Sequence, residues 1–422
     1  MIYNEIKSEK LGESYFKIKH SSGLTVYVYP KEGYSSTYAI FGTNYGSVNT
    51  KFSVDGKYTQ SVPDGIAHYL EHKMFESEEG DAFAKYAETG ASANAYTSFE
   101  KTCYLFSCTE NFEKTLKILI DLVQVPYFTK ENVEKEQGII GQEIKMYDDS
   151  PAWRVMFNLL ECLYHNHPVK IDIAGTVETI AEITAEKLYN CYNSFYNLNN
   201  MALCVCGNVT VEQVLDVVNS NIKEEKSQTV ETFFPNEPQT VVKDYVEQQF
   251  PVAVPLFQLG FKENPTDNRA TSKEMALTDI LLFALASNSS TLYNELIEKE
   301  LINTTFDYEY LEGPQYRATI FSGESRNPKE VAKIVKDYIA NILNSGITTE
   351  EFEVAKRAVY GMAVSSMDSN SSVANMLIES DFSNKEIFSY IDNINNATLE
   401  EVNNRLKNQF IVENSALSVV KG

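Results

Sequence analysis

Residues 102–123 read TCYLFSCTENFEKTLKILIDLV, which is typical of a short alternating strand followed by an amphipathic helix. The same order of strand, turn and helix returns at residues 317–339, RATIFSGESRNPKEVAKIVKDYI. A second pair follows, because residues 129–150 (TKENVEKEQGIIGQEIKMYDDS) align with residues 348–369 (TTEEFEVAKRAVYGMAVSSMDS). The two offsets, 215 and 219 residues, keep the order and the spacing of the segments. The sequence therefore predicts a duplicated α/β unit.

Strand and helix patterns alternate along both halves of the chain. The strand candidates are Leu24–Tyr29, Tyr38–Tyr45 and Cys103–Cys108, and the helix candidates are Glu113–Val125, Lys130–Tyr147, Ala185–Tyr196, Lys329–Leu343 and Thr349–Met367. This mixture favours an α+β fold, in which helices pack on sheets. We expect one domain over residues 1–226, a linker over 227–239 and a homologous second domain over 240–422.

Composition and charge exclude several classes of protein. A net charge of −23 over 422 residues argues against binding to nucleic acid or to an anionic membrane, because both need clustered Lys and Arg. It is compatible with basic peptide substrates, although an acidic solvated surface explains it as well. The polar N-terminus, MIYNEIKSEKLGESYFKIKH, lacks the apolar core of a signal peptide, and no run approaches the length of a membrane span. Six scattered cysteines fit a reducing, cytoplasmic location.

The chemistry of the chain is indicated by residues 64–72, DGIAHYLEH. Asp64 is expected to cap a helix on which His68, Glu71 and His72 share one face, since they are spaced i, i+3 and i+4. Two imidazoles one turn apart can bind a zinc ion, and a carboxylate beside them can take a proton from a metal-bound water. This pattern predicts a metallopeptidase site with Glu71 as the general base.

A catalytic zinc needs a third protein ligand. The predicted helix Lys130–Tyr147 carries Glu136 and Glu143, which are seven residues apart and therefore on one face. Gly138 and Gly141 lower the helix propensity of this segment and suggest that another backbone comes close. Either carboxylate could complete the site on this pattern alone.

The remaining histidines do not share this pattern. All five histidines lie at or before position 167, and His165 and His167 stand in a predicted loop before Pro168, so we expect surface positions for them. In the second repeated segment Ala355 replaces Glu136 and Met362 replaces Glu143. The second half is therefore expected to keep the fold and to lack the metal ligands.

Several motifs in the same order resemble the inverted-zincin peptidases of the pitrilysin, insulin-degrading enzyme and mitochondrial processing peptidase family. They are HYLEH at 68–72, GASANAYT at 90–97 and EQGIIGQEI at 136–144. The resemblance implies a zinc ion held by His68, His72 and Glu143, with Glu136 supporting the site from behind. It also implies that a peptide substrate adds to the edge strand along Asn94, Ala95 and Tyr96.

The short bacterial members of this family each form one half of a clamshell, so the resemblance implies a homo-dimer or hetero-dimer with a related subunit. There is one departure from the family pattern. Where the family often reads Ser-Ser-Arg-Leu, this chain reads Ser289-Ser290-Thr291-Leu292, so the Arg is absent. The prediction is a zinc metalloendopeptidase, and the alternative is a peptide-binding or assembly subunit of low activity that needs a companion subunit.

Overall fold

The computed structural model describes residues 3–78, 80–223 and 226–422. The contacts divide the chain into two compact units, and neither unit is a continuous stretch. Unit 1 comprises residues 1–144, 172–233 and 364–388, and unit 2 comprises residues 145–171, 234–363 and 389–422. The sequence predicted domains at 1–226 and 240–422 with a linker at 227–239, and these boundaries stay a prediction about the repeat. Each compact unit contains segments from both predicted domains.

Unit 1 is built on a seven-stranded sheet with the order β1-β2-β3-β11-β4-β10-β9. Its strands are β1 (Tyr3–Ser8), β2 (Glu13–Lys19), β3 (Thr25–Pro30), β11 (Met201–Gly207), β4 (Thr37–Thr43), β10 (Thr102–Cys108) and β9 (Ser92–Thr97). Smaller sheets contain β5 (Lys51–Val54), β6 (Gln60–Ser61) and β12 (Val230–Thr232), and β7 (Glu76–Ser77) with β8 (Gly80–Asp81). The strands predicted from the sequence as Leu24–Tyr29, Tyr38–Tyr45 and Cys103–Cys108 are confirmed as β3, β4 and β10.

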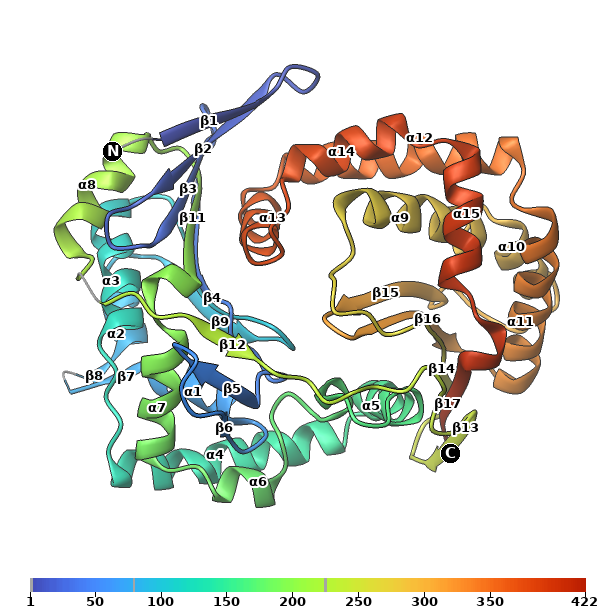
Figure 1. Cartoon of the computed structure of the whole chain (residues 1–422), viewed down its shortest axis with the longest axis horizontal. Coiled ribbons are helices and arrows are strands. Elements are labelled where there is room, and N and C mark those ends of the chain that lie inside the picture. The colour runs from blue at the N-terminus through green and yellow to red at the C-terminus, as the bar shows by residue number, and fades with distance from the viewer. Residues whose placement is uncertain (1–2, 79, 224–225) are drawn as a thin grey trace. The chain divides into compact units, whose positions relative to one another are not determined.

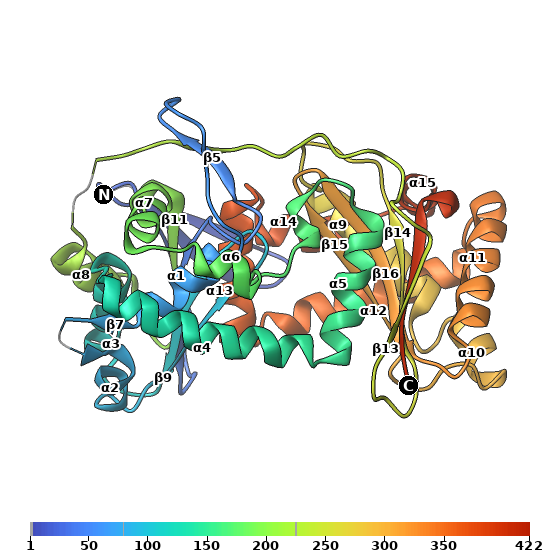
Figure 2. The ribbon, with the colours of Figure 1, turned by 90° about the horizontal axis from the view of Figure 1, so that it is seen from below.

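Helices cover both faces of this sheet. They are α1 (Ile66–Met74), α2 (Ala82–Ala87), α3 (Phe112–Gln124), α4 (Lys130–Asp148), α6 (Val177–Ala181), α7 (Ala185–Phe195), α8 (Val211–Asn221) and α13 (Asn370–Phe382). Helices α3 and α8 lie on one face of the sheet, and α13 lies on the opposite face against β4 and β11 (Figure 1). Figure 2 shows α4 as one long helix.

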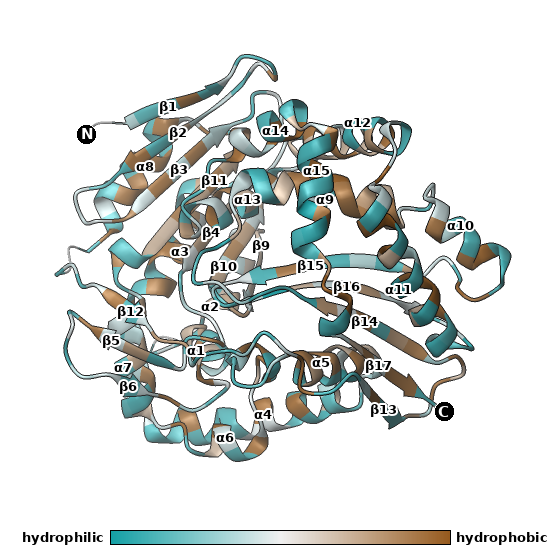
Figure 3. Cartoon of the chain, turned by 45° about the vertical axis from the view of Figure 1, so that its right-hand side comes forward, coloured by the Kyte–Doolittle hydropathy of each residue, from teal (hydrophilic) through white to brown (hydrophobic). Residues whose placement is uncertain are grey.

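Unit 2 is built on a five-stranded sheet with the order β13-β17-β14-β16-β15. Its strands are β13 (Tyr245–Gln249), β17 (Ser415–Lys421), β14 (Leu256–Lys262), β16 (Tyr316–Glu324) and β15 (Asp307–Gly313). Its helices are α5 (Pro151–Leu163), α9 (Ser272–Ala286), α10 (Thr291–Glu298), α11 (Pro328–Ser345), α12 (Thr349–Ser366), α14 (Ile387–Asn396) and α15 (Leu399–Gln409). Short 3-10 turns lie at Pro168–Lys170, Leu198–Asn200 and Val412–Asn414. Apolar residues line β14 and β17 (Figure 3), which is expected of strands that helices cover.

The two sheets share one topology. The run β3-β11-β4-β10-β9 corresponds strand by strand to β13-β17-β14-β16-β15. In each run the first pair is parallel and the next three pairs are antiparallel. The order of helices between the fourth and the last strand in sequence also matches, from α3, α4 and α5 to α11, α12 and α13. The duplicated α+β unit predicted from the sequence is confirmed.

Each unit takes one covering helix from the other half of the chain. Helix α5 follows α4 in sequence but packs on β14 and β17 of unit 2. Helix α13 follows α12 but packs on β4 and β11 of unit 1. Since α5 and α13 are equivalent in the repeat, the exchange is reciprocal. A sequence pattern cannot reveal such an exchange, because it depends on which sheet a helix reaches.

A buried ion pair holds the predicted linker to unit 2. The Lys262 ammonium and the Glu237 carboxylate have fully buried side chains, and their Nζ and Oε1 atoms are 2.6 Å apart. Lys262 also donates to the carbonyls of Leu163 and Thr240, and Glu237 accepts the backbone N–H groups of residues 165–167. The end of the predicted linker is therefore fixed rather than free.

One segment passes a test of length and hydropathy for a membrane span, which the sequence analysis did not find. It runs from Ser272 to Glu298, 27 residues with a mean hydropathy of 1.3 in its most apolar window. In the structure this segment is the pair α9 and α10, and 67% of that window is buried. Most of its buried residues belong to the apolar core of unit 2, which explains their composition.

Candidate metal centre

Helix α1 places the predicted HxxEH residues beneath the edge strand β9. The expected cap by Asp64 is wrong: Gly65 is the N-cap, with φ of 86°, and no side chain caps the helix. Only glycine fits there, because a Cβ on Gly65 would come within 2.3 Å of the carbonyl oxygen of Ala174. His68 and Glu71 are buried and His72 is partly buried. The helix therefore presents the three side chains in a sheltered site within unit 1.

Helix α4 brings a carboxylate between the two imidazole rings. Glu143 Oε2 lies 3.7 Å from His68 Nε2 and 3.4 Å from His72 Nε2. These are close to the donor separations of roughly 3.3 Å that a tetrahedral zinc with bonds of about 2.0–2.1 Å requires. The donor atoms of His68, His72 and Glu143 all lie within 4.8 Å of one another. The residues present thus fit a divalent metal ion without rearrangement of the helices.

Glu136, two turns earlier on α4, lies behind His72 instead of between the rings. Its Oε1 atom is 3.1 Å from His72 Nδ1, so the two Glu residues of α4 occupy different places. This contact favours the tautomer in which His72 Nδ1 carries the proton and Nε2 keeps a free lone pair for a metal. Gly138 and Gly141 of the same helix have no atom of another element within 4 Å of a built Cβ, so the expected close backbone is absent at both.

Lys73 joins this arrangement, and sequence reasoning missed it. Its side chain is fully buried, it pairs with the Glu76 carboxylate, and its Nζ lies 3.8 Å from Glu136 Oε2. A buried ammonium needs such partners. The signal in the sequence was only a charged residue next to His72 on a helix with an apolar inner face, which does not reveal burial.

The charges of the site follow from these contacts. Burial and the neighbouring His72 lower the pKa of His68 to about 4. Burial also opposes the charged form of His72, but its hydrogen bonds with Glu136 and Glu143 outweigh burial and raise its pKa to about 10, so a metal ion that binds His72 Nε2 must displace a proton. Burial raises the pKa of Glu71 above its usual range, which suits a carboxylate that must accept a proton.

Glu71 has a partner on β9. Thr97 Oγ1 donates a hydrogen bond of 3.0 Å to Glu71 Oε2. Sequence reasoning quoted Thr97 as part of the edge-strand motif but gave it no role. The alternation of β9, which puts Ala93, Ala95 and Thr97 on the side facing α1, was the available signal.

The residues predicted to receive a peptide lie on that edge strand. Asn94, Ala95 and Tyr96 belong to β9, which pairs with β10 on one side and is the last strand of the seven-stranded sheet. Asn94 is exposed, and its Oδ1 accepts from the N–H of Ala95. Tyr96 faces away from α1 and donates through its hydroxyl to Asn375 of α13 at 2.8 Å. An edge strand offers backbone groups for the addition of another strand.

His165 and His167 lie in unit 2, and the surface prediction is wrong for His167. Its side chain is fully buried, with ring centroids 5.0 Å from Phe234 and 4.9 Å from Tyr316, and burial lowers its pKa to about 4. His165 is partly exposed. Thr291, which stands where the resembled family has Arg, is the first residue of α10 behind the cap Ser290.

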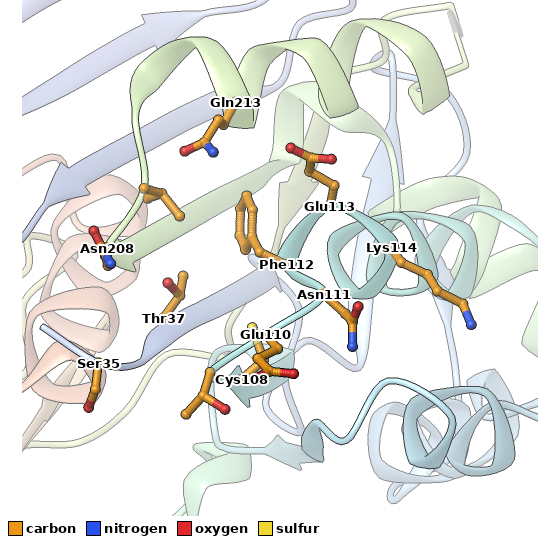
Figure 4. Close-up of a pocket in the computed structure, with 12 residues that line it drawn as sticks. Ser35, Thr37, Cys108, Glu110, Asn111, Phe112, Glu113, Lys114, Asn208 and Gln213 are labelled. Atoms are coloured by element: carbon orange, nitrogen blue, oxygen red, sulfur yellow. The ribbon is translucent and has the colours of Figure 1, made fainter.

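A separate pocket of unit 1 has a volume of about 430 Å³ and lies where β10 and β11 end and α3 and α8 begin. Figure 4 shows its polar lining, including Ser35, Asn111 and Gln213. None of the residues that line it belongs to the cluster of His68, His72 and Glu143. The chemistry of the HxxEH segment is therefore not connected with this pocket.

A sheet edge beside two imidazoles, a carboxylate between them and a second carboxylate outside the ligand set defines the class of metallopeptidases with an HxxEH helix. Comparisons with known proteins lead to the same class. The family model described as "Insulinase (Peptidase family M16)" matches residues 58–177, and that described as "Peptidase M16 inactive domain" matches residues 182–359.

An uncharacterized zinc protease of Bacillus subtilis, YmfH, is 39% identical over 97% of this chain and 96% of its own length. The crystal structure of a putative M16-like peptidase from Alicyclobacillus acidocaldarius superposes with a TM-score of 0.93 at 34% identity, covering 100% of this chain and 99% of that one. A protease from Helicobacter pylori shares the fold with a TM-score of 0.83 at 20% identity, over 97% of this chain and 100% of that one. The chain belongs to peptidase family M16, and the resemblance stated from its motifs is confirmed.

Proposed function

We propose that the chain is a zinc-dependent endopeptidase that binds its metal through His68, His72 and Glu143. The observation that carries the proposal is the position of Glu143 Oε2, within 3.7 Å of both imidazole Nε2 atoms. Two imidazoles and one carboxylate are a donor set typical of catalytic zinc and leave a position open for water. The zinc proteases among the relatives support the same metal.

Glu71 is the general base in this proposal. Bound zinc would supply an acidified water and a positive charge beside the peptide carbonyl oxygen. Glu71, buried and one turn from His68, takes a proton from the water as its oxygen attacks the scissile carbonyl carbon. The same carboxyl group then gives that proton to the nitrogen of the leaving amine as the peptide bond breaks. Burial raises the pKa of Glu71, which makes it a stronger base than an exposed carboxylate.

Glu136 and the edge strand have supporting roles. Glu136 holds His72 by its Nδ1 atom and fixes the orientation of the ring. An extended peptide pairs its backbone with β9 along Asn94 to Tyr96, which would align the scissile bond above α1. Addition to an edge strand selects unfolded segments or short peptides, because a folded protein has few free strands to offer.

The test is a comparison of purified wild-type chain with Glu71→Gln on a library of quenched peptides. Glu71→Gln should keep zinc at the wild-type stoichiometry and lower kcat by about 10²- to 10⁴-fold. Glu134→Gln, an exposed change on α4, is the matched control and should leave both quantities unchanged. Cleavage by Glu71→Gln at the wild-type rate would refute the assignment of the base.

Thr291 favours a second candidate function. The family that the chain resembles often has Arg at this place, and the second half matches the model described as an inactive domain. The chain would then be a peptide-binding subunit of low activity that is completed by a related companion subunit, in a homo-dimer or hetero-dimer. Zinc-dependent cleavage by the chain alone supports the endopeptidase, whereas tight peptide binding with cleavage only after addition of a companion supports the second candidate.

We also propose that the chain works in the cytoplasm. Its six cysteines are free thiols, and all of them are buried. A reducing compartment suits such a set of thiols. Fractionation of cells that produce the chain tests this location directly.

A further inference from the structure

Strand β9 connects the expected peptide-binding edge with the general base. Its side chains alternate, and Ala93 and Ala95 pack against the apolar core of unit 1 on the side of α1. Thr97 continues this row as the last residue of the strand. Its hydroxyl therefore points toward α1, where Oγ1 donates to Glu71 Oε2 at 3.0 Å.

The direction of this hydrogen bond is set by its neighbours. Thr102, the register partner of Thr97, donates its hydroxyl proton to the backbone carbonyl oxygen of Tyr45 at 2.9 Å. Thr102 Oγ1, 3.4 Å from Thr97 Oγ1, has no second proton and can only accept. The Thr97 hydroxyl therefore has two possible acceptors, Thr102 Oγ1 at 3.4 Å and Glu71 Oε2 at 3.0 Å. The carboxylate oxygen is closer and charged, so it is the stronger acceptor.

We propose that Thr97 is a positioning residue that orients the Glu71 carboxylate for its role as a base, an inference that rests on the proposed function. The hydroxyl engages Oε2 and leaves the other carboxylate oxygen to meet the attacking water. Without this donor, a side chain with several rotatable bonds would lose a fixed orientation, and a catalytic group out of place by about 1 Å loses much of its effect.

The repeat gives an independent reason to connect Thr97 with the metal-bearing unit. With the offset of 215 residues, Arg317 of β16 corresponds to Thr102, and its register partner on β15 is Glu312. The pair of hydroxyls in unit 1 therefore corresponds to a pair of charged residues in unit 2. Unit 2 has the same strands without a general base, so the fold does not require two threonines at this register.

The inference also couples peptide binding to the base. Thr97 follows directly on Asn94 to Tyr96, the residues expected to pair with substrate. A peptide backbone that pairs with β9 holds this strand in place. The Thr97 hydroxyl, at the end of the same strand, then holds the Glu71 carboxylate in place through its hydrogen bond. Loss of the Thr97 hydroxyl is therefore expected to lower turnover more than it weakens peptide binding.

The experiment compares Thr97→Val, Thr97→Ser and wild-type chain, assayed together with any related subunit that co-purifies. Valine keeps the shape of threonine in a strand and removes only the hydroxyl. We expect Thr97→Val to lower kcat about ten- to a hundredfold, because a hydrogen bond to a charged group is lost, with KM within about twofold of wild type. Thr97→Ser should recover kcat to within about threefold, since it restores the donor. Zinc content and melting temperature should stay at wild-type values in both variants.

Two further arms separate the outcomes. Thr25→Val makes the same change at a buried threonine of β3, which β11, β4 and β10 separate from β9, and should leave kcat unchanged. A crystal structure of metal-free Thr97→Val should show the Glu71 carboxylate displaced. A wild-type kcat in Thr97→Val, or a kcat of Thr97→Ser as low as that of Thr97→Val, would overturn the inference about Thr97. If Glu71→Gln is inactive in the same assay, the proposed function still stands. Full activity of Glu71→Gln overturns both.

Discussion

Units 1 and 2 carry the same strands in the same order, but only unit 1 has a cluster of potential metal ligands among the residues that the structure describes. The difference lies on equivalent helices. Glu136 and Glu143 of α4 correspond to Ala355 and Met362 of α12. At the first pair of positions, Glu136 and Ala355 are both buried. At the second pair, Glu143 lies beside two imidazoles, whereas Met362 is exposed. The comparison teaches that the fold does not depend on the metal, so the ligands of unit 1 serve chemistry.

The two units also differ in the partners of their buried charged residues. Helix α9 lies in an apolar core, and two buried cations of unit 2 are paired with carboxylates, Lys262 with Glu237 and Arg405 with Glu263. In unit 1 the buried Glu136 and Lys73 lie beside an imidazole pair instead. These two sets of buried charges have different roles: the pairs of unit 2 stabilise the fold, and Glu136 with Lys73 supports the site of unit 1.

The largest effect is expected from removing the ligand that unit 2 lacks. Glu143→Ala should lower the affinity for zinc by more than about a thousandfold, because a catalytic zinc has only three protein ligands. Met362→Ala, the matched change on α12, should leave one zinc per chain. Metal analysis and competition with a chelator measure both. Full zinc occupancy in Glu143→Ala would remove Glu143 from the ligand set and end the contrast between the units.

A large effect on stability is expected in unit 2. Lys262→Met leaves Glu237 buried without its counter-charge and should lower the free energy of unfolding by about 3 to 4 kcal/mol. Zinc content should not change, since the pair lies outside unit 1. Urea unfolding followed by a probe in unit 2 measures the loss. A variant in which Glu237→Gln accompanies Lys262→Met should recover part of it, and no difference between wild type and Lys262→Met would show that the pair is not structural.

Glu136→Gln tests the supporting carboxylate and should have a smaller effect than loss of a ligand. Gln can still accept from His72 Nδ1, but it carries no charge, so zinc affinity should fall about ten- to a hundredfold. Chelator competition gives the value, with the exposed change Glu134→Gln on the same helix as the control. A loss as large as that of Glu143→Ala would mean that Glu136 binds the metal directly.

The smallest effect concerns a buried carboxyl group of unit 2 that has no imidazole partner. Burial raises the pKa of Asp279 from 3.8 to about 6, although the Tyr390 hydroxyl donates to it. Between these values the folded chain binds more protons than the unfolded chain, so stability falls as pH rises from about 4 to 6. Asp279→Asn should therefore stabilise the chain by about 1 to 2 kcal/mol at pH 7.5 and by nothing at pH 4. Thermal unfolding at both pH values checks the sign, and destabilisation at pH 7.5 would contradict it.

The sequence predicted the elements of the fold far better than their partners. The long helices were found to within about three residues, as with Lys130–Tyr147 against Lys130–Asp148, because amphipathic periodicity is a local property. Helix α5 was not predicted at all, and the exchange of α5 and α13 depends on contacts between residues far apart in the chain. Patterns of this kind carry no information about which sheet a helix covers.

Part of the site could be predicted from the sequence, again because helical periodicity is a local property. His68, Glu71 and His72 share one helix face, so their spacing was sufficient. The choice of Glu143 over Glu136 needed the resemblance to a family, because seven residues put both on one face of α4. Thr97 and Lys73 were missed, since a threonine in a strand and a lysine in a helix are ordinary until their burial and partners are known.

The reciprocal use of α5 and α13 has a consequence for synthesis on the ribosome. The seven-stranded sheet of unit 1 has all its strands once Gly207 has been made, but its covering helix α13 is not complete until about 175 residues later, at Phe382. A nascent chain must therefore keep the uncovered face of β4 and β11 from sticking to other polypeptides during translation. Cutting the gene at the predicted linker would produce two fragments that each lack a helix, and mixing such fragments after separate production should rescue solubility only when both are present.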